Sequence, residues 1–506
     1  MKILLSWARR PSDPDIGTMI SRLTLGGHRV VYFVGDPIDE RLTPEGGIFH
    51  SYRDAVESIP ARGIDLFSFE PLGEEIIRKL YRAESLALTM MNLICNNLCV
   101  DERRRIYYGM VRYWRGVLLA CQPDVLIFPN MPHAVYDYIL YELAHAFGIK
   151  TILFDDTRFP GRLLPFSDFK CLTKSLQEEI VRNRGKNFSL NDLADDIRDY
   201  YVSRSRRDYN VTPSYIKDLK EKHSLRWSLP WKDIARCVKD FSVFKKAPRY
   251  LMWFLPAKGR EILRRARTHG SYLFVSDLRK EYTALQVFPD FSRKFVYFPL
   301  QKQPERSTSP QGDMFVDQLL ALEILSASVP DDWVIYVKEH PVQWVHFGIR
   351  FSSFRYRGYY EKIARIRNVR LLPLDINSYK LINTSQLVSA VTGSAGWEAV
   401  LRSKPAIIFG TVWYQDCPGI FKATGVEDCR KAVDTIIAGF RIDQAKMVHY
   451  LKCFDAVTFR GFIASSAGRA SNVSKEECIR NISEAVVREI GNMQVGTTRE
   501  ISYYHV

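Results

Sequence analysis

Residues 333–344, WVIYVKEHPVQW, combine the pattern of a buried strand with an ending made of charged and chain-breaking residues. The apolar run WVIYV leads directly into Lys338, Glu339, His340 and Pro341. A second apolar run, in residues 387–400 (LVSAVTGSAGWEAV), ends in a turn of small residues. Ligands of open parallel sheets bind beyond the carboxyl ends of the strands. The two segments therefore predict strands of one parallel sheet that share a binding edge.

Strand-like and helical patterns alternate on both sides of these two segments. The expected strands are YLFVS, KFVYFPLQ, DWVIYVKEHP, VRLLP, LVSAVTG and PAIIFG. The expected helices between them are GDMFVDQLLALEILSAS, GYYEKIARIRN, INSYKLINTSQ and SAGWEAVLRSK. This alternation predicts a doubly wound parallel sheet.

The N-terminal half predicts a second α/β unit. KILLSWA and HRVVYFVG read as strands with a helical stretch between them, and residues 72–120 read as long helices. PDVLIFPN, HAVYDYILYELAHAFG and IKTILFDDTRFPG predict a parallel strand pair joined by a right-handed helical crossover, with Gly148 at the helix C-terminus. A charged region, 180–225, reads as helical and peripheral.

A chain of 506 residues is too long for one ordinary core. We expect an N-terminal Rossmann-like domain (1–220), a basic aromatic connector (221–270) and a C-terminal Rossmann-like domain (271–425). A helical tail (426–506) is expected to pack back toward the N-terminal domain. The predicted fold class is α/β, with two facing doubly wound domains in the arrangement called GT-B.

Three strand ends of the C-terminal domain are expected to meet at one rim, and all three are polar. The candidate donor-binding residues at these ends are Gln301, Glu305, Arg306, Lys338, His340, Pro341, Thr392, Gly393, Ser394, Ala395, Gly396 and Glu398. Beside a phosphate, the imidazolium form of His340 is favoured and can neutralise a leaving nucleotide. The alternatives are a structural histidine at a strand end and a loop sealed by its own polar groups.

The turn TGSAG, residues 392–396, has the features of an anion-binding helix start. Unpaired backbone N–H groups at a helix start attract an anion, and the helix dipole assists. Gly393 and Gly396 would let a phosphate come close, the hydroxyl groups of Thr392 and Ser394 would add donors, and Glu398 could reach a ribose hydroxyl. Tight packing between a strand and a helix is the competing interpretation.

Transfer of a group to a hydroxyl needs a carboxylate that deprotonates the acceptor or takes the transferred group covalently. Asp155 and Asp156 stand at a strand end of the first domain, and adjacent residues of an extended chain point to opposite sides, so only one should face the ligand. Arg158 or Arg162 could hold that carboxylate or an acidic acceptor. Alternatively, one aspartate caps the following turn. We expect no metal and no cofactor.

Composition narrows the classes of partner. The formal net charge of +15 favours an anionic partner, but the excess is concentrated in the connector and no nucleic-acid-binding motif accompanies it. Basic residues interleaved with aromatic residues suit an anionic membrane surface, and a connector with a solvated basic face is the alternative. Nine scattered cysteines and the lack of a signal-peptide pattern or apolar span predict a cytoplasmic protein.

Three segments, YFPLQKQPERSTSPQG, VKEHP and TGSAGWEAVLRSKPAIIFGTVWY, resemble the bacterial capsule polysaccharide synthesis family, which includes CMP-Kdo-dependent transferases acting on lipid acceptors. The resemblance covers roughly residues 290–415 well and the N-terminal half loosely. It implies a GT-B glycosyltransferase that uses a nucleotide-activated acidic sugar, with CMP-Kdo as one form, at the inner face of the cytoplasmic membrane. By the same resemblance, His340, Pro341 and residues 392–396 hold the nucleotide phosphate and the sugar carboxylate.

We therefore expect a metal-independent glycosyltransferase that extends a capsular or other surface polysaccharide, or its lipid-linked acceptor. A nucleotide-sugar epimerase or a polyol-phosphate transferase of similar architecture is a second hypothesis. A non-catalytic protein of glycan assembly is a third.

Overall fold

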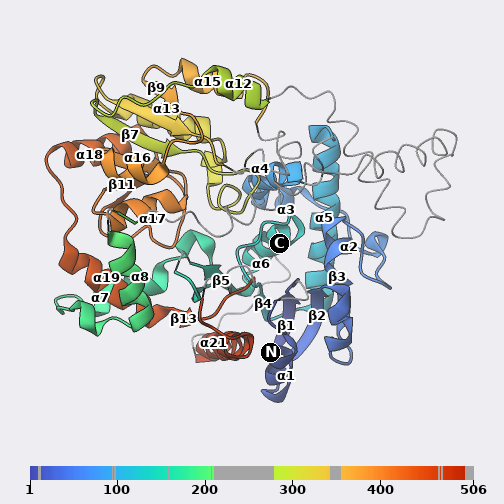
Figure 1. Cartoon of the computed structure of the whole chain (residues 1–506). Helices are drawn as coiled ribbons and strands as arrows, with labels where there is room; N and C mark the ends of the chain where they lie inside the picture. Colours follow the sequence, from blue (N-terminus) through green and yellow to red (C-terminus); the bar gives the residue numbers. More distant parts are fainter. Residues whose placement is uncertain are drawn as a thin grey trace, which may run out of the picture.

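The structure is a computed structural model that describes residues 1–9, 13–93, 95, 98–157, 159–206, 208–209, 278–341, 343, 355–464, 468 and 471–495. The expected connector, 221–270, and the expected strand YLFVS lie outside the described residues. Two sheets in separate halves of the molecule organise the rest of the chain (Figure 1).

The first sheet has the order β13-β6-β5-β4-β1-β2-β3. Its strands are β1 (Lys2–Ser6), β2 (Arg29–Gly35), β3 (Ile48–Ser51), β4 (Val125–Ile127), β5 (Lys150–Asp156), β6 (Arg162–Phe166) and β13 (Phe459–Arg460). The predicted parallel pair is β4 and β5, and Gly148 between helix and strand has a φ of 72°, which glycine adopts easily. β6 and β13 were not predicted, and both pair antiparallel to their neighbours.

The second sheet has the order β12-β11-β10-β7-β8-β9, and all its strand pairs are parallel. Its strands are β7 (Phe295–Pro299), β8 (Val334–Lys338), β9 (Val369–Leu371), β10 (Leu387–Ala390), β11 (Ala406–Ile408) and β12 (Ile420–Lys422). Every residue of β8 is buried, because helices cover both faces of the sheet.

Helices lie on both sides of each sheet. Those that follow the first sheet's strands are α1 (Gly17–Leu25), α2 (Tyr52–Val56), α3 (Glu74–Lys79), α4 (Tyr81–Met90), α5 (Val100–Cys121), α6 (Tyr136–Ala146), α7 (Lys174–Arg182) and α8 (Asp195–Ser205). Those of the second half are α12 (Leu278–Ala284), α13 (Gln318–Ser328), α15 (Tyr359–Arg365), α16 (Ser378–Thr384), α17 (Ser394–Leu401), α18 (Val426–Ile437) and α19 (Gln444–Val457), followed by the final helix α21 (Lys475–Val495).

Alternating side chains of each strand pack into two apolar layers, one on each face of the sheet. In β7, Phe295 and Tyr297 pack into one layer, whereas Val296 and Phe298 pack into the layer on the opposite face. The first sheet is likewise packed between a layer that contains α4, α5 and α6 and a layer that contains α1 and α21. The predicted α/β fold of two Rossmann-like units with a helical C-terminal part is confirmed.

The two halves contact each other at α7 and α8, and again at α4. Apolar residues of α7 and α8 pack with Trp397, Trp413 and α19 in one continuous layer. On the other side, α4 meets the loop after β7, where the Thr89 and Ser309 hydroxyl groups are 2.8 Å apart and Arg82 pairs with Asp313. Within the described part of the chain, no helix is both long enough and apolar enough to cross a bilayer.

Candidate functional site

The order of the second sheet brings the three polar strand ends to one edge. β7 lies between β8 and β10, and the pairing of Pro299 with Lys338 aligns the ends of β7 and β8. The three strands run in the same direction, so residues 300–301, 339–340 and 391–393 follow them at the same edge. Strands two places apart in a sheet are separated by about 10 Å. His340 and the start of α17 therefore flank the same short piece of chain after β7.

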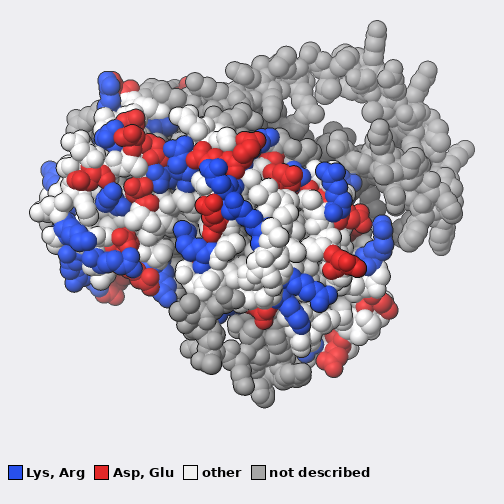
Figure 2. Space-filling view, turned by 90° about the horizontal axis from the view of Figure 1, so that it is seen from below, with Lys and Arg blue, Asp and Glu red and all other residues white. Residues whose placement is uncertain are grey.

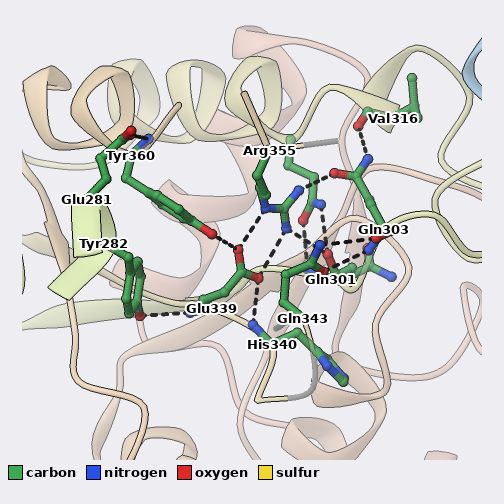
Figure 3. A network of polar contacts seen from close by, with 11 residues as sticks. Glu281, Tyr282, Gln301, Gln303, Val316, Glu339, His340, Gln343, Arg355 and Tyr360 are labelled. Atoms are coloured by element: carbon green, nitrogen blue, oxygen red, sulfur yellow. Dashed lines mark hydrogen bonds and ion pairs between the residues drawn. The ribbon is translucent and has the colours of Figure 1, made fainter. Parts of the chain in front are cut away.

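Glu339 is the centre of a buried network at this edge (Figure 3). Its Oε2 accepts hydrogen bonds from Arg355 Nε at 2.7 Å and from Tyr360 Oη at 2.7 Å. Its Oε1 accepts from Arg355 Nη2 at 3.1 Å and from the backbone N–H of His340 at 2.7 Å. The backbone N–H of Glu339 donates to Tyr282 Oη at 3.0 Å. The anion in VKEHP is thus an internal anchor that fixes the chain at His340.

Arg355, which the sequence analysis missed, completes this anchor. Its side chain is 0% exposed, its Nη2 donates to the Gln301 carbonyl at 3.0 Å, and its Nη1 donates to Gln303 Oε1. The guanidinium also lies over the ring of Tyr359 at 4.7 Å. Nothing local in the sequence marks Arg355, since it lies outside every strand and helix and only the fold brings it to Glu339.

The glutamines of this edge brace the loop after β7. The Gln301 side chain accepts the backbone N–H of Thr392 at 2.9 Å and donates to the Thr392 hydroxyl at 3.0 Å. Gln318 and Gln343 pair with the backbone of Gln301 and Gln303 in the same two-bond manner. Gln301 was expected to contact the ligand, but its amide is occupied by Thr392 because the loop between strands needs partners for its buried backbone groups.

The backbone of His340 is bonded to this network, whereas its imidazole ring points away from it (Figure 3). Burial lowers the pKa of His340 to about 4, and the nearby carboxylates of Glu305 and Glu339 oppose this shift only in part. The imidazole is therefore neutral near pH 7, which differs from the expected imidazolium. A neutral ring can still donate one N–H to a phosphate oxygen.

The start of α17 keeps the properties expected of an anion site. Gly393, Ser394 and Ala395 are half-buried, whereas the residues on either side are buried, so the turn reaches solvent. The N-cap residue is Gly393, which has no side chain to cap the helix N-terminus. Ser394 Oγ donates to Glu398 Oε1 at 3.3 Å, so these two residues support each other one turn apart.

Three other candidates at this edge have internal roles. The Thr392 hydroxyl donates to the Ser307 carbonyl, and Lys338 Nζ donates to the Ile376 carbonyl at 2.7 Å and to Ser378 Oγ at 2.6 Å. A Cβ on Gly396 would stand 3.0 Å from Tyr414 Oη, which donates to the Gly393 carbonyl. Gly396 thus makes room for a tyrosine, where we had expected it to make room for a phosphate, because the helix packs against the segment after β11.

The loop after β7 also carries the remaining charged candidates. Glu305 is 44% exposed and pairs with Lys302 at 3.0 Å. Arg306 is half-buried, and its guanidinium forms no ion pair or hydrogen bond with any residue that the structure describes. Pro341 is half-buried directly after His340. Arg306 is therefore the cation at this edge that is best placed to take an anionic ligand.

Asp155 and Asp156 lie at the end of β5, on opposite faces of the first sheet. Asp155 is buried and shares its face with Leu153, which packs with α6. Asp156 is half-buried and shares its face with Phe154, which packs with α21, and its charge helps to raise the pKa of the buried Cys478 thiol. The two carboxylates therefore belong to different surroundings, although they are adjacent in sequence.

The arginine expected to hold an acceptor is used inside the fold. Arg162 is buried and pairs with both oxygens of Asp196 at 2.7 and 2.8 Å and with Asp455 at 2.8 Å, because β6 packs between α8 and α19. Arg158 lies outside the described residues. Nearby, His133 Nδ1 donates to the Met131 carbonyl at 2.8 Å. Among the described residues, no three His, Cys, Asp or Glu side chains gather as a metal site.

Comparisons with known proteins identify relatives of this chain. A family described as "Capsule polysaccharide biosynthesis protein" matches residues 233–446. The capsule polysaccharide modification protein LipA of Neisseria meningitidis serogroup B is 38% identical over 80 residues, which are 16% of this chain and 10% of LipA. The chain thus spans only about a tenth of that relative. These matches confirm the predicted resemblance to the capsule polysaccharide synthesis family.

Two solved structures are similar at low sequence identity. The β-Kdo 2,7 transferase KpsC of Thermosulfurimonas dismutans is 11% identical with a TM-score of 0.30, over 74% of this chain and 89% of that chain. The UDP-GlcNAc 2-epimerase of Methanocaldococcus jannaschii is 11% identical with a TM-score of 0.24, over 97% of this chain and 100% of that chain.

Proposed function

We propose that the protein is a glycosyltransferase that moves a sugar from a nucleotide-activated donor to a capsular or related surface polysaccharide, or to its lipid-linked acceptor. The observation that carries the proposal is the edge where His340, Arg306 and the uncapped start of α17 meet after three neighbouring strands. The resemblance to the capsule polysaccharide synthesis family supports this class of reaction.

The donor's phosphate would bind at the start of α17. Backbone N–H groups of the half-buried turn at Ser394 and Ala395, together with the helix dipole, favour a negative group there. Arg306 would add a full positive charge, and His340 would donate an N–H to the oxygen that leaves with the nucleotide. As the bond to the sugar breaks, negative charge grows on that oxygen, so these donors stabilise the transition state more than the bound donor.

The acceptor side would use a carboxylate of the first sheet. Asp155 or Asp156 would take the proton of the attacking hydroxyl group, or would accept the sugar covalently before its transfer. The half-buried Asp156 is the more accessible of the two, whereas Asp155 is buried.

The finer assignments are also part of the proposal. They are a CMP-linked acidic sugar such as Kdo, no metal requirement, and attachment to the inner face of the cytoplasmic membrane. Arg306 and the N–H groups at α17 suit an acidic sugar because they can pair with its carboxylate as well as with the phosphate. The division at 1–220, 221–270, 271–425 and 426–506 remains our proposal for the domain limits.

A donor screen tests the function. Purified protein is incubated with CMP-, UDP- and GDP-sugars and a lipid-linked or oligosaccharide acceptor, and products are identified by mass. We expect transfer from a CMP-sugar. Interconversion of a free nucleotide sugar would replace the proposal by an epimerase, and no turnover with any donor would favour a non-catalytic role.

Variants assign the roles within the site. His340→Ala should lower kcat by about 100-fold or more, since a donor to the leaving group is lost. His28→Ala, at a partly exposed position of the first half, is the matched control and should leave turnover unchanged. Of Asp155→Asn and Asp156→Asn, one should abolish transfer while donor binding persists. If both variants remained fully active, the catalytic carboxylate would have to be sought elsewhere.

A further inference from the structure

A pocket that is separate from the strand edge lies between the two halves of the chain. It has a volume of about 580 Å³ and is formed by the end of α7, the loop at 184–188, the loop at 416–418 and the first turns of α19. We call it the α7–α19 pocket. Pockets that hold small ligands have volumes of about 300–1,000 Å³, so this one has room for one or two sugar rings. Figure 1 places α7 and α19 side by side at the lower left.

The surface that lines this pocket is mainly apolar and includes aromatic side chains. Phe188 packs against the ring of His449 with centroids 5.5 Å apart, and the His449 Nδ1 is 3.2 Å from the Lys186 carbonyl. Tyr450 is buried and its hydroxyl donates to the Trp413 carbonyl at 3.3 Å, so its polar end is already satisfied inside the fold. These rings offer flat surfaces to a ligand with an apolar face.

Cations surround this surface. Arg184, Lys186 and Lys446 line the pocket and are exposed, and neither Arg184 nor Lys446 has an acidic partner within the described part of the chain. Figure 2 shows Lys and Arg side chains gathered at the left, the side where Figure 1 places α7 and α19.

Two aspartates limit the kind of anion that fits. Asp443 is used as the N-cap of α19, where it accepts the backbone N–H groups of Ala445 and Lys446. Asp416 accepts from Gln177 at 2.9 Å through Oδ1, but its Oδ2 is buried without a hydrogen-bond partner. Oδ2 is too enclosed for a ligand to reach, but Oδ1 can accept a second hydrogen bond, so a ligand hydroxyl group that donates to Oδ1 would be stabilising.

We propose that the α7–α19 pocket binds an acidic saccharide, held by its carboxylate at Arg184 and Lys446, by its ring at Phe188 and by a hydroxyl group at Asp416. A sugar acid carries one negative charge per ring together with several hydroxyl donors, which matches this mixture of cations and carboxylates. A nucleotide phosphate, with more charge and fewer donors, would be repelled by Asp416 and Asp443. The choice of a saccharide also rests on the proposed function, with the ligand being a segment of the acidic glycan outside the reacting centre.

The pocket is connected to the strand edge by a short segment. Tyr414 donates to the Gly393 carbonyl at the start of α17, and two residues later Asp416 lines the pocket. Gln415 Nε2 donates to Thr173 Oγ1 at 3.0 Å, which ties the same segment to the first half of the chain. A glycan segment bound here would therefore lie beside the donor site without occupying it.

Binding is measured without donor, by calorimetry on the full chain with a sialic acid tetrasaccharide and trigalacturonate. Maltotetraose is the neutral control, and CMP and inorganic phosphate are the phosphate controls. We expect the acidic oligosaccharides to bind and maltotetraose not to bind. The double variant Arg184→Ser with Lys446→Ser should weaken acidic binding by about tenfold or more, and Phe188→Ala should weaken it as well.

Arg182→Ser is the matched control, because Arg182 is 70% exposed at the end of α7, just before the loop that carries Arg184, and pairs with Glu179 outside the pocket. Unfolding midpoints identify variants that have lost the fold, and Arg184→Lys then replaces Arg184→Ser. Equal binding of acidic and neutral oligosaccharides, tighter binding of CMP, or full binding by the folded double variant would overturn the inference. Turnover without pocket binding defeats this inference alone, and pocket binding without turnover defeats only the proposed function.

Discussion

Glu339 and Arg355 form a bidentate ion pair whose two side chains are both 0% exposed, and the same carboxylate holds the backbone of His340. A buried charge is tolerated only when its partners remain in place. The pair therefore couples the stability of the second half of the chain to the position of the proposed catalytic histidine. Glu281 supports it from α12 by accepting the backbone N–H groups of Gly358 and Tyr360, both at 2.9 Å.

Replacement of Glu339 by Gln should destabilise the protein by about 3–5 kcal/mol, because the Arg355 guanidinium would lose its counter-charge inside the fold. The measurement is the urea unfolding midpoint. Glu361→Gln is the control: Glu361 is 55% exposed and pairs with Arg365 at 3.9 Å, so its loss should change stability by less than about 0.5 kcal/mol. Equal midpoints for the two variants would show that the buried pair is not a stabilising anchor.

Stability should fall with pH below neutrality, and His340 should contribute to that fall. The pKa of His340 is about 4 in the folded chain and 6.5 in its ordinary state, so the unfolded chain takes up the proton first. The free energy of unfolding is therefore highest, as far as His340 is concerned, above about pH 6.5. It falls by up to about 3 kcal/mol as the pH falls toward 4. Burial is the main cause of this lowered pKa; the charges of Lys302 and Arg355 add to it, whereas those of Glu305 and Glu339 oppose it.

The test of this pH dependence is the difference in unfolding free energy between His340→Gln and the unchanged protein. Glutamine keeps a polar side chain but does not titrate, so the variant should gain relative stability between pH 6.5 and pH 4. A difference that stays constant over this range would contradict the buried, neutral histidine.

Gly396 should tolerate alanine only when Tyr414 is shortened. A Cβ at this position would lie 3.0 Å from Tyr414 Oη and would displace the hydroxyl from the Gly393 carbonyl, at an expected cost of about 1–3 kcal/mol. Phe at position 414 removes the hydroxyl that is in the way. In a double-mutant cycle, Tyr414→Phe should therefore be less destabilising in the Gly396→Ala protein than alone. Strictly additive effects would refute this close approach.

The hydroxyl group of Thr392 should matter more than its methyl group. Thr392→Val would leave Gln301 Nε2 and the Ser307 carbonyl without partners in a buried place, which should cost about 1–3 kcal/mol and weaken donor binding. Thr392→Ser retains both hydrogen bonds and is the control. Urea unfolding and donor titration follow the two effects, and a valine variant as stable as the serine variant would argue against the brace.

The strands of the second half were predictable because each is a continuous apolar run, which a sheet covered on both faces requires. β6 (RLLPF) was not predicted because it contains Pro165. A proline has no N–H to donate to a neighbouring strand, so it is rare within strands. β13 pairs Phe459 with Leu163 across almost three hundred residues of chain. No local pattern marks a two-residue strand of this kind.

The candidate site was predictable in position but less so in the roles of its residues. The strand-end rule placed His340 and residues 392–396 on one edge, since strand direction alone determines which ends meet. Which side chains face a ligand depends on the partners that the loops provide. Gln301, Lys338 and Thr392 found those partners inside the fold, whereas the guanidinium of Arg306 pairs with no residue that the structure describes and the turn at Ser394 is only half-buried.

The sequence by itself determined the class of fold, the parallel second sheet and the edge that carries its polar groups, because hydrophobic periodicity and strand direction are local properties of the chain. Only the tertiary structure decided that Arg355 neutralises Glu339, that Arg162 joins Asp196 and Asp455, and that His340 is neutral. These outcomes depend on burial and on charges brought together from distant segments. How far a side chain is removed from water depends on the folded molecule, so a local stretch of sequence does not determine it.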